Sequence, residues 1–197
     1  MKAMRNFRAA AALTLFALVQ APAPAAVLPR PAPDLAISLG QGKQLKLTQY
    51  KGKTVVLAFI LTYCSHCQKV IAALAKMQNE YAARGLQVVA SATEDMAASA
   101  LPAFLRQYAP PFPVGFNTNV ESAAFLQHPP MLMFYMPAVV FIDKDGVIRA
   151  QYEGRDQFLE EASAEKNIRA KLEELLPRPA HKKPPGKKGP AKSGAAE

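Results

Sequence analysis

The feature that most constrains this chain is a pair of cysteines placed between an apolar run and a helical pattern. Residues Thr54 to Leu61 are mostly β-branched, aliphatic or aromatic, which predicts a buried strand, and helix-period apolar residues begin at Val70. Cys64 and Cys67 lie between the two. Because the first N–H groups of a helix and its positive dipole end stabilise an anion, this junction favours a thiolate at Cys64, with Cys67 one helical turn away.

The cysteine count limits what the pair can do, because the chain has only 2 cysteines. A structural disulfide gains little stability from closing so short a loop. A closed zinc site needs four ligands, and no second Cys-x-x-Cys supplies the others, so a metal site would have to recruit His66, His128 and methionines. The pattern favours reversible dithiol–disulfide exchange, in which one thiolate attacks a partner and the other resolves the mixed disulfide.

Three sequence segments together resemble one known family. Cys64-Ser-His-Cys67 follows an apolar strand, Met136-Pro137 precedes another, and the upstream segment 47–59 has the sequence Leu-Thr-Gln-Tyr-Lys-Gly-Lys-Thr-Val-Val-Leu-Ala-Phe. Over residues 33–176 the chain resembles the thioredoxin superfamily, in particular the exported TlpA-type thiol–disulfide oxidoreductases and related redoxins. The resemblance implies an α/β thioredoxin-like fold, with a central mixed sheet, helices on both faces and an N-terminal hairpin extension.

The resemblance also assigns roles around the dithiol. Cys64 would be the attacking cysteine, Cys67 the resolving one, and Pro137 the cis-proline that faces the disulfide, with Tyr63 and Met136 contacting the substrate. Such proteins need no cofactor beyond their own dithiol and exchange with protein thiols or disulfides and a redox-recycling partner. We expect a monomer with no resident metal.

His66 lies between the cysteines, where a positive charge would favour the thiolate of Cys64. A stabilised thiolate makes the disulfide more oxidising. TlpA-type relatives, however, are mostly reductants, so the direction of electron flow stays open. The alternative is an exposed histidine without effect.

Two positions depart from the thioredoxin pattern. Thioredoxins carry a buried aspartate six residues before the first cysteine, where this chain has Ala58, and a tryptophan directly before it, where this chain has Tyr63. By resemblance to TlpA-type proteins, Glu94 at the end of the next strand would take the acid–base role. The alternative for Glu94 is a charge at the start of the following helix.

A methionine-rich segment precedes Pro137, with the sequence His128-Pro-Pro-Met-Leu-Met-Phe-Tyr-Met136. Flexible methionines suit a surface that accepts apolar partners, but they also suit Cu(I) together with the cysteines and His128, or simple core packing. A copper-binding or copper-delivery module is therefore an alternative function. A second alternative is a thioredoxin-like peroxidase, although Leu61 stands at the threonine of the pattern Pro-x-x-x-Thr-x-x-Cys.

The ends of the chain differ in character from its body. Residues 1–25 combine a basic start, an apolar run over 9–19 and Ala23-Pro-Ala25, which is typical of a secretory signal peptide, an uncleaved anchor being the alternative. This predicts a periplasmic or otherwise exported protein without stable membrane insertion after signal removal. Residues 177–197 form a basic, Pro- and Lys-rich tail that we expect to be disordered. Of the formal +9 charge, residues 26–176 retain about +1, so nucleic-acid binding is not indicated.

Residues 26–176 form one domain's worth of chain. After a Pro-rich lead-in, apolar periodicity and turn residues predict a hairpin at its start, a strand–helix–strand unit around the cysteines, a second hairpin and a final amphipathic helix. The predicted strands are 34–39, 44–47, 54–61, 86–90, 114–116, 138–143 and 147–152, and the predicted helices are 65–84, 96–108 (late-starting or kinked at Pro102), 120–127 and 157–176.

Overall fold

The computed structural model describes residues 26–178, so the predicted signal peptide and the tail after Arg178 lie outside the described residues. Within this range, eight strands form one mixed sheet in the order β1-β8-β7-β4-β5-β6-β2-β3. No helix between residues 26 and 178 is long and apolar enough to cross a membrane. The strands are β1 (Arg30–Pro31), β2 (Ala36–Gly40), β3 (Lys43–Lys46), β4 (Thr54–Ile60), β5 (Leu86–Ala92), β6 (Val114–Phe116), β7 (Ala138–Ile142) and β8 (Val147–Tyr152).

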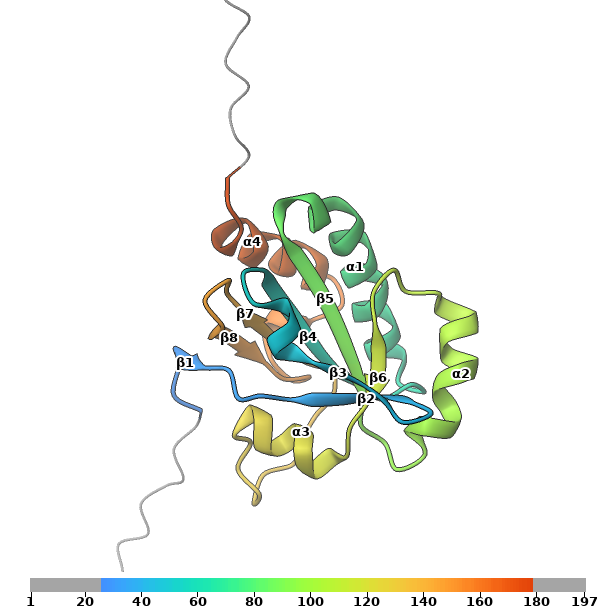
Figure 1. Cartoon of the computed structure of the whole chain (residues 1–197). Coiled ribbons are helices and arrows are strands. Elements are labelled where there is room, and N and C mark those ends of the chain that lie inside the picture. Colours follow the sequence, from blue (N-terminus) through green and yellow to red (C-terminus); the bar gives the residue numbers. More distant parts are fainter. Residues whose placement is uncertain (1–25, 179–197) are drawn as a thin grey trace, which may run out of the picture.

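The helices are α1 (Ser65–Tyr81), α2 (Ala97–Tyr108), α3 (Asn119–Leu126) and α4 (Ala164–Leu175). They cover both faces of the sheet: α1, α2 and α4 pack on one face, and α3 packs on the other together with the β2–β3 hairpin (Figure 1). The predicted mixed sheet with helices on both faces is therefore confirmed.

Strand β4 is the centre of the sheet because it is buried on both faces. It pairs in parallel with β5 and antiparallel with β7, and all seven of its residues are buried. A strand covered on both sides needs apolar residues throughout, which explains the continuous apolar run in the sequence. Successive side chains enter opposite cores, namely Val55, Leu57 and Phe59 beside α3, and Val56, Ala58 and Ile60 beside α1.

The two edges of the sheet are both built by the N-terminal part of the chain. The predicted hairpin is present as β2–β3, which pairs with β6. The two-residue strand β1 pairs with β8 at the opposite edge and was not predicted, because the Pro-rich lead-in has no periodicity. Arg30 in β1 is buried, and its guanidinium donates to the carbonyl of Phe125 at 2.8 Å and to Gln151 at 3.1 Å.

Helix α1 agrees closely with its prediction, whereas α2 does not in detail. The predicted inward face of α1 is buried, and Gly85 ends the helical segment with φ 93°. Helix α2 runs through Pro102, which lies on its exposed side where water can replace the missing hydrogen bond. The prediction that Leu105 points inward was wrong, since this residue is 37% exposed.

The last helix begins later than predicted. Gln157–Leu159 form a short 3₁₀ helix capped by Asp156, the backbone then becomes extended at Glu160, and α4 starts only at Ala164. This break leaves the carbonyl of Leu159 free of the α4 hydrogen-bond ladder. It accepts a hydrogen bond from the ring of His66 instead, at 2.6 Å.

Candidate active site

Cys64 is the N-cap residue of α1 and follows the carboxyl end of β4. Its backbone is extended, and its sulfur accepts the N–H of Cys67 at 3.4 Å. The side chain is half-buried. The sulfur thus caps the first turn of α1, where the helix dipole and free N–H groups stabilise negative charge.

Cys67 has a different environment, although it is only three residues away. It is 0% exposed, and its sulfur accepts the N–H of Leu61 at 3.5 Å. Burial raises the pKa of the Cys67 thiol well above its usual range. The hydrogen bond from the Leu61 N–H offsets part of this increase, and the neighbouring Cys64 and the charge of Glu94 each raise the pKa by smaller amounts. Cys67 is therefore held as a thiol, and Cys64 is the accessible sulfur.

Glu94 lies between β5 and α2, and it does not cap α2. The N-cap of α2 is Met96 and has no side-chain cap hydrogen bond. The Oε1 atom of Glu94 instead accepts two hydrogen bonds from Thr62, one from its N–H at 3.1 Å and one from its hydroxyl. Its Oε2 atom is buried and has no hydrogen-bond partner among the described residues.

Ala58 is fully buried in the same core cluster as Cys67. At the position where thioredoxins have a buried aspartate, this chain therefore offers no polar group to Cys67. The carboxylate whose charge acts on Cys67 follows the end of the neighbouring strand, at Glu94.

Met136 and Pro137 form the loop before β7, and their peptide bond is cis. Pro137 is buried, and the half-buried Met136 packs against both core clusters. Gly154 supports this loop and was missed by sequence reasoning: its N–H donates to the carbonyl of Tyr135 at 3.2 Å, and a Cβ built on it would lie 2.5 Å from the carbonyl oxygen of Met136. Only glycine allows so close an approach of two backbones.

Tyr63 precedes Cys64 in the sequence and His66 follows it, and the two side chains have different surroundings. Tyr63 is 72% exposed. His66 is half-buried, and because its Nε2 atom lies against the Leu159 carbonyl, which only accepts, Nε2 carries a hydrogen that it donates there. Its ring is thereby fixed between α1 and the segment before α4.

The methionine-rich loop is exposed, but its histidine is engaged. Met131 is 93% exposed, and Leu132 and Met133 are also exposed. The two ring nitrogens of His128 lie 3.1 Å from a carboxylate oxygen of Glu153 and 3.1 Å from the carbonyl of Leu132. Between residues 26 and 178, no group of three His, Cys, Asp or Glu side chains could hold a metal ion. Each ring nitrogen of His128, the histidine named in the copper alternative, lies against an oxygen atom of the protein.

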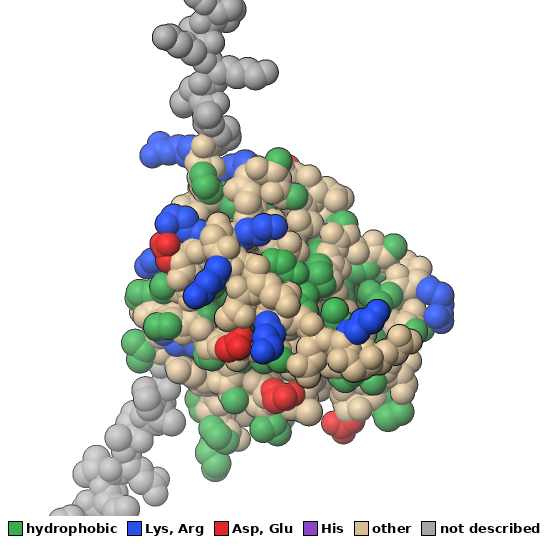
Figure 2. Space-filling view, in the orientation of Figure 1, with side chains coloured by type: hydrophobic (Ala, Val, Ile, Leu, Met, Phe, Trp, Pro, Cys, Tyr) green, Lys and Arg blue, Asp and Glu red, His purple; other side chains and the backbone are tan. Residues whose placement is uncertain are grey.

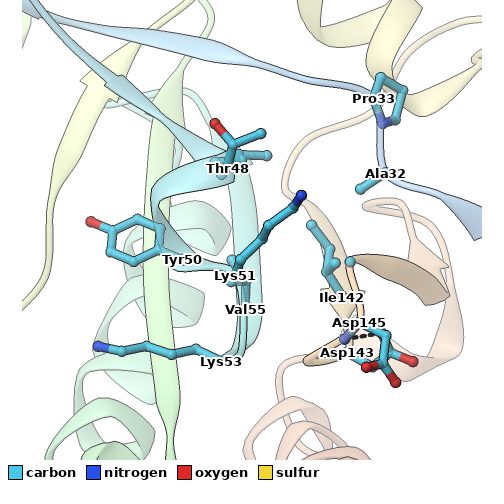
Figure 3. Close-up of a pocket in the computed structure, with 12 residues that line it drawn as sticks. Ala32, Pro33, Thr48, Tyr50, Lys51, Lys53, Val55, Ile142, Asp143 and Asp145 are labelled. Atoms are coloured by element: carbon cyan, nitrogen blue, oxygen red, sulfur yellow. Dashed lines mark hydrogen bonds between the residues drawn. The ribbon is translucent and has the colours of Figure 1, made fainter.

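A well-formed pocket lies away from these residues, at the amino end of β4. It has a volume of about 130 Å³ and is lined by residues that include Tyr50, Lys51, Asp143 and Asp145. In Figure 3, Lys53 and Asp145 point away from each other across this pocket. Since β4 has seven residues at about 3.3 Å each, the pocket is about 20 Å from the cysteines.

On the face drawn in Figure 2, Lys and Arg side chains are dispersed over several elements rather than gathered in one stripe.

The profile of the AhpC/TSA family matches residues 28–151. The thiol-disulfide oxidoreductase ResA of Bacillus thuringiensis subsp. konkukian (strain 97-27) is 28% identical over 123 residues, which cover 62% of this chain and 68% of the relative. The thioredoxin-like protein YneN of Bacillus subtilis (strain 168) is 29% identical over 124 residues, 62% of this chain and 69% of the relative. Among solved structures, a putative thiol:disulfide interchange protein DsbE from Chlorobium tepidum aligns with a TM-score of 0.60 and 28% identity, covering 73% of this chain and 96% of that chain.

Proposed function

The chain belongs to the AhpC/TSA family and is a thioredoxin-fold thiol–disulfide oxidoreductase, and from this premise we propose that it is exported and exchanges its Cys64–Cys67 dithiol with the thiols and disulfides of other proteins. The observation that carries the proposal is the difference between the two sulfurs. Cys64 is half-buried at a helix start, and Cys67 is fully buried and held as a thiol. One sulfur is thus arranged to attack, and the other to resolve.

The exchange proceeds in two balanced steps. The Cys64 thiolate attacks one sulfur of a substrate disulfide, the new S–S bond forms as the old one breaks, and the leaving thiolate takes up a proton. Cys67 then loses its proton and attacks Cys64, which releases the second substrate thiol and leaves a Cys64–Cys67 disulfide. The substrate gains two electrons and the protein loses two. The reverse sequence oxidises a substrate dithiol.

Glu94 serves as the base that accepts the Cys67 proton. The proposal is supported by its buried Oε2 atom, which has no partner among the described residues, and by the effect of its charge on the Cys67 thiol. Because Ala58 is apolar, Glu94 replaces the inner carboxylate of thioredoxins. A base held near a buried thiol speeds thiolate formation by about 10²–10⁴-fold.

Protein substrates fit the surroundings of Cys64 better than small molecules do. Tyr63 is exposed beside it, Met136 is half-exposed next to Pro137, and such amphipathic and flexible side chains suit varied apolar segments of polypeptide. Export is supported by the basic and apolar start of the sequence, and it places the dithiol where disulfides persist.

A trapping experiment tests the proposal. Cys67→Ser should accumulate mixed disulfides with reducible protein substrates, whereas Cys64→Ser should form none and should not reduce insulin. Mass spectrometry of the trapped species identifies the sulfur that attacks. Trapping by Cys64→Ser alone would reverse the roles, and rapid peroxide consumption without insulin reduction would favour the peroxidase alternative. Equilibration of the dithiol with glutathione then gives the direction of electron flow.

A further inference from the structure

Thr62 lies at the junction between β4 and the cysteines and directs both of its hydrogen-bond donors to one atom. Its N–H donates to Glu94 Oε1 at 3.1 Å, and its hydroxyl donates to the same oxygen. Thr62 is buried. A carboxylate oxygen can accept two hydrogen bonds, and the two donors of Thr62 fill both places on Oε1.

We propose that Thr62 is a positioning residue for the resolving step, which holds Glu94 by Oε1 so that Oε2 is presented to the Cys67 thiol. This inference rests on the proposed function, since it concerns the proton that Cys67 must lose. Oε1 is occupied twice, whereas Oε2 is buried and has no partner among the described residues. Because both hydrogen bonds are made to Oε1, only Oε2 remains able to accept a proton.

Two consecutive backbone N–H groups contact the two reacting groups. The N–H of Leu61 donates to Cys67 Sγ at 3.5 Å, and the next N–H along the chain, that of Thr62, donates to Glu94. The sulfur and the carboxylate are thus attached to adjacent peptide groups. The charge of Glu94 is accordingly felt by Cys67, whose thiol pKa it helps to raise.

The Thr62 segment is itself fixed on both sides. The side-chain amide of Gln68 in α1 donates to the Thr62 carbonyl at 2.9 Å, and the Cys64 N–H donates to the Leu61 carbonyl at 3.1 Å. Thr62 therefore does not move independently of the helix that carries the cysteines. A group fixed in this way can orient another within the tolerance that proton transfer requires.

Glu94 also has a connection to the surface on its other side. With Thr93, Asp95 and Asn117, it lines a surface pocket of about 220 Å³. A proton taken from Cys67 can pass from the carboxylic acid to solvent at this pocket. In the resolving step, the Cys67 S–H bond breaks, its proton goes to Glu94 Oε2, and the thiolate forms the S–S bond with Cys64 as the substrate thiolate leaves.

The test separates attack from resolution with 5,5′-dithiobis(2-nitrobenzoate) and the full reduced protein. The first thionitrobenzoate is released when Cys64 attacks, and the second when Cys67 resolves the mixed disulfide. In Thr62→Val, which removes the hydroxyl at nearly constant volume, the second phase should slow about tenfold, as expected for a lost hydrogen bond to a charged group. The first phase should stay within about twofold, because the Cys64 cap is untouched. Thr62→Ser should restore the second phase.

The pH profile distinguishes positioning from a loss of structure. With Glu94 in place, the second phase should be nearly constant around neutral pH. In Thr62→Val it should rise steadily toward alkaline pH, because burial keeps the Cys67 thiol protonated unless a base is presented to it. Thr62→Ala provides a second hydroxyl-free variant if Thr62→Val does not fold.

Thr93→Val is the matched control. Thr93 is also buried and is adjacent to Glu94, but its hydroxyl donates to the Ile60 carbonyl at 3.3 Å and not to the carboxylate. It should keep the wild-type pH profile. If the hydroxyl-free Thr62 variants and Thr93→Val show the same second phase and profile, the inference is overturned. Cys64→Ser keeps only the Cys67 thiol and can release one equivalent at most; if it does so as fast as the first phase of the wild type, the proposed function itself fails, independently of Thr62.

Discussion

The two ends of β4 both carry acidic side chains, but in opposite states. At the amino end, Asp143 accepts the N–H groups of Asp145 and Val147 at 2.9 and 3.0 Å and pairs with Arg149 at 2.6 Å. At the carboxyl end, Glu94 has one oxygen held by Thr62 and the other buried without a partner among the described residues. The first carboxylate is fully satisfied, and the second keeps an acceptor free.

This difference explains why the shape of the surface does not locate the chemistry. The pocket at the amino end is lined by Lys51 and Lys53 and by Asp143 and Asp145, and the two aspartates already have basic partners. The redox end also has pockets beside it, one lined by Glu94 and another by His66. What distinguishes this end is that it joins a half-exposed sulfur to a buried thiol and a partly satisfied acid. Buried polar groups that lack some of their hydrogen bonds are more typical of a reactive site than a surface hollow alone.

The largest contrast between the two ends should appear in turnover. Glu94→Gln keeps the shape of the side chain and removes its basicity, so we expect insulin reduction to fall by about 10²-fold. Asp143→Asn at the other end should change turnover by less than about twofold, because residues that are far apart and share no partners have nearly independent effects. Equal losses in the two variants would contradict the assignment of the acid–base role to Glu94.

Gly154 provides a sharper test of the loop that contains Pro137. In Gly154→Ala, the new Cβ would meet the Met136 carbonyl, which lies 2.5 Å from its position, so the loop must shift. We expect roughly tenfold slower reduction of protein substrates, because small displacements of positioning groups are costly. The reaction with a small aromatic disulfide should change little. Thermal unfolding monitors the folded state, and an equal loss on both substrates would place the effect at Cys64 instead.

His66 should set the redox poise by a smaller amount. Replacement of His66 by Pro is compatible with the first turn of α1, where the backbone N–H has no helical partner. The change removes from the first turn beside Cys64 an imidazole ring, which favours the thiolate when it is protonated. The disulfide should therefore become less oxidising by about 30 mV, a tenfold change in the equilibrium constant. Equilibration with glutathione measures this potential, and identical values for the two proteins would assign His66 to packing against Leu159.

The smallest effect concerns acid stability at the amino end. Although burial alone would raise the pKa of Asp143, the N–H groups of Val147 and Asp145 and the Arg149 side chain together lower it below its usual value. A lowered pKa in the folded state stabilises the fold above the pKa of the unfolded chain, and this contribution is lost as pH falls through the folded value. Urea unfolding of wild type and Asp143→Asn should therefore differ by roughly 1 kcal/mol near neutral pH and converge below about pH 3. A difference that persists in acid would exclude this ionisation as its source.

The sequence predicted β4, α1 and the placement of the cysteines well, because periodicity and burial agree there. The buried run of β4 and the apolar face of α1 are strong local signals. The start of the last helix was predicted too early because Gln157 and Leu159 fit the helical pattern, while the His66 hydrogen bond to the Leu159 carbonyl is a tertiary contact. Local pattern cannot reveal which partner a carbonyl will find.

The sequence predicted the two cysteines of the candidate site, but it did not predict the residues that hold the neighbouring groups in position. Glu94 was proposed from resemblance, with a helix-start charge as the alternative, whereas Thr62 was not singled out. A threonine at the end of a buried strand is ordinarily explained by β-propensity. Gly154 was also missed, because its requirement comes from the close approach of a loop that is distant in the chain. Both residues act through contacts between segments, which spacing along one segment does not encode.

The adjacent amides of Leu61 and Thr62 have a consequence for mutational tolerance. One N–H serves the sulfur of Cys67 and the next serves the carboxylate of Glu94, and both donors belong to the main chain. A substitution at Leu61 or Thr62 therefore leaves these two donors in place, even where it removes the hydroxyl that Thr62 also donates to Glu94. Proline alone lacks the required hydrogen, so it is the one residue whose introduction at either position would delete a backbone contact of the redox site outright.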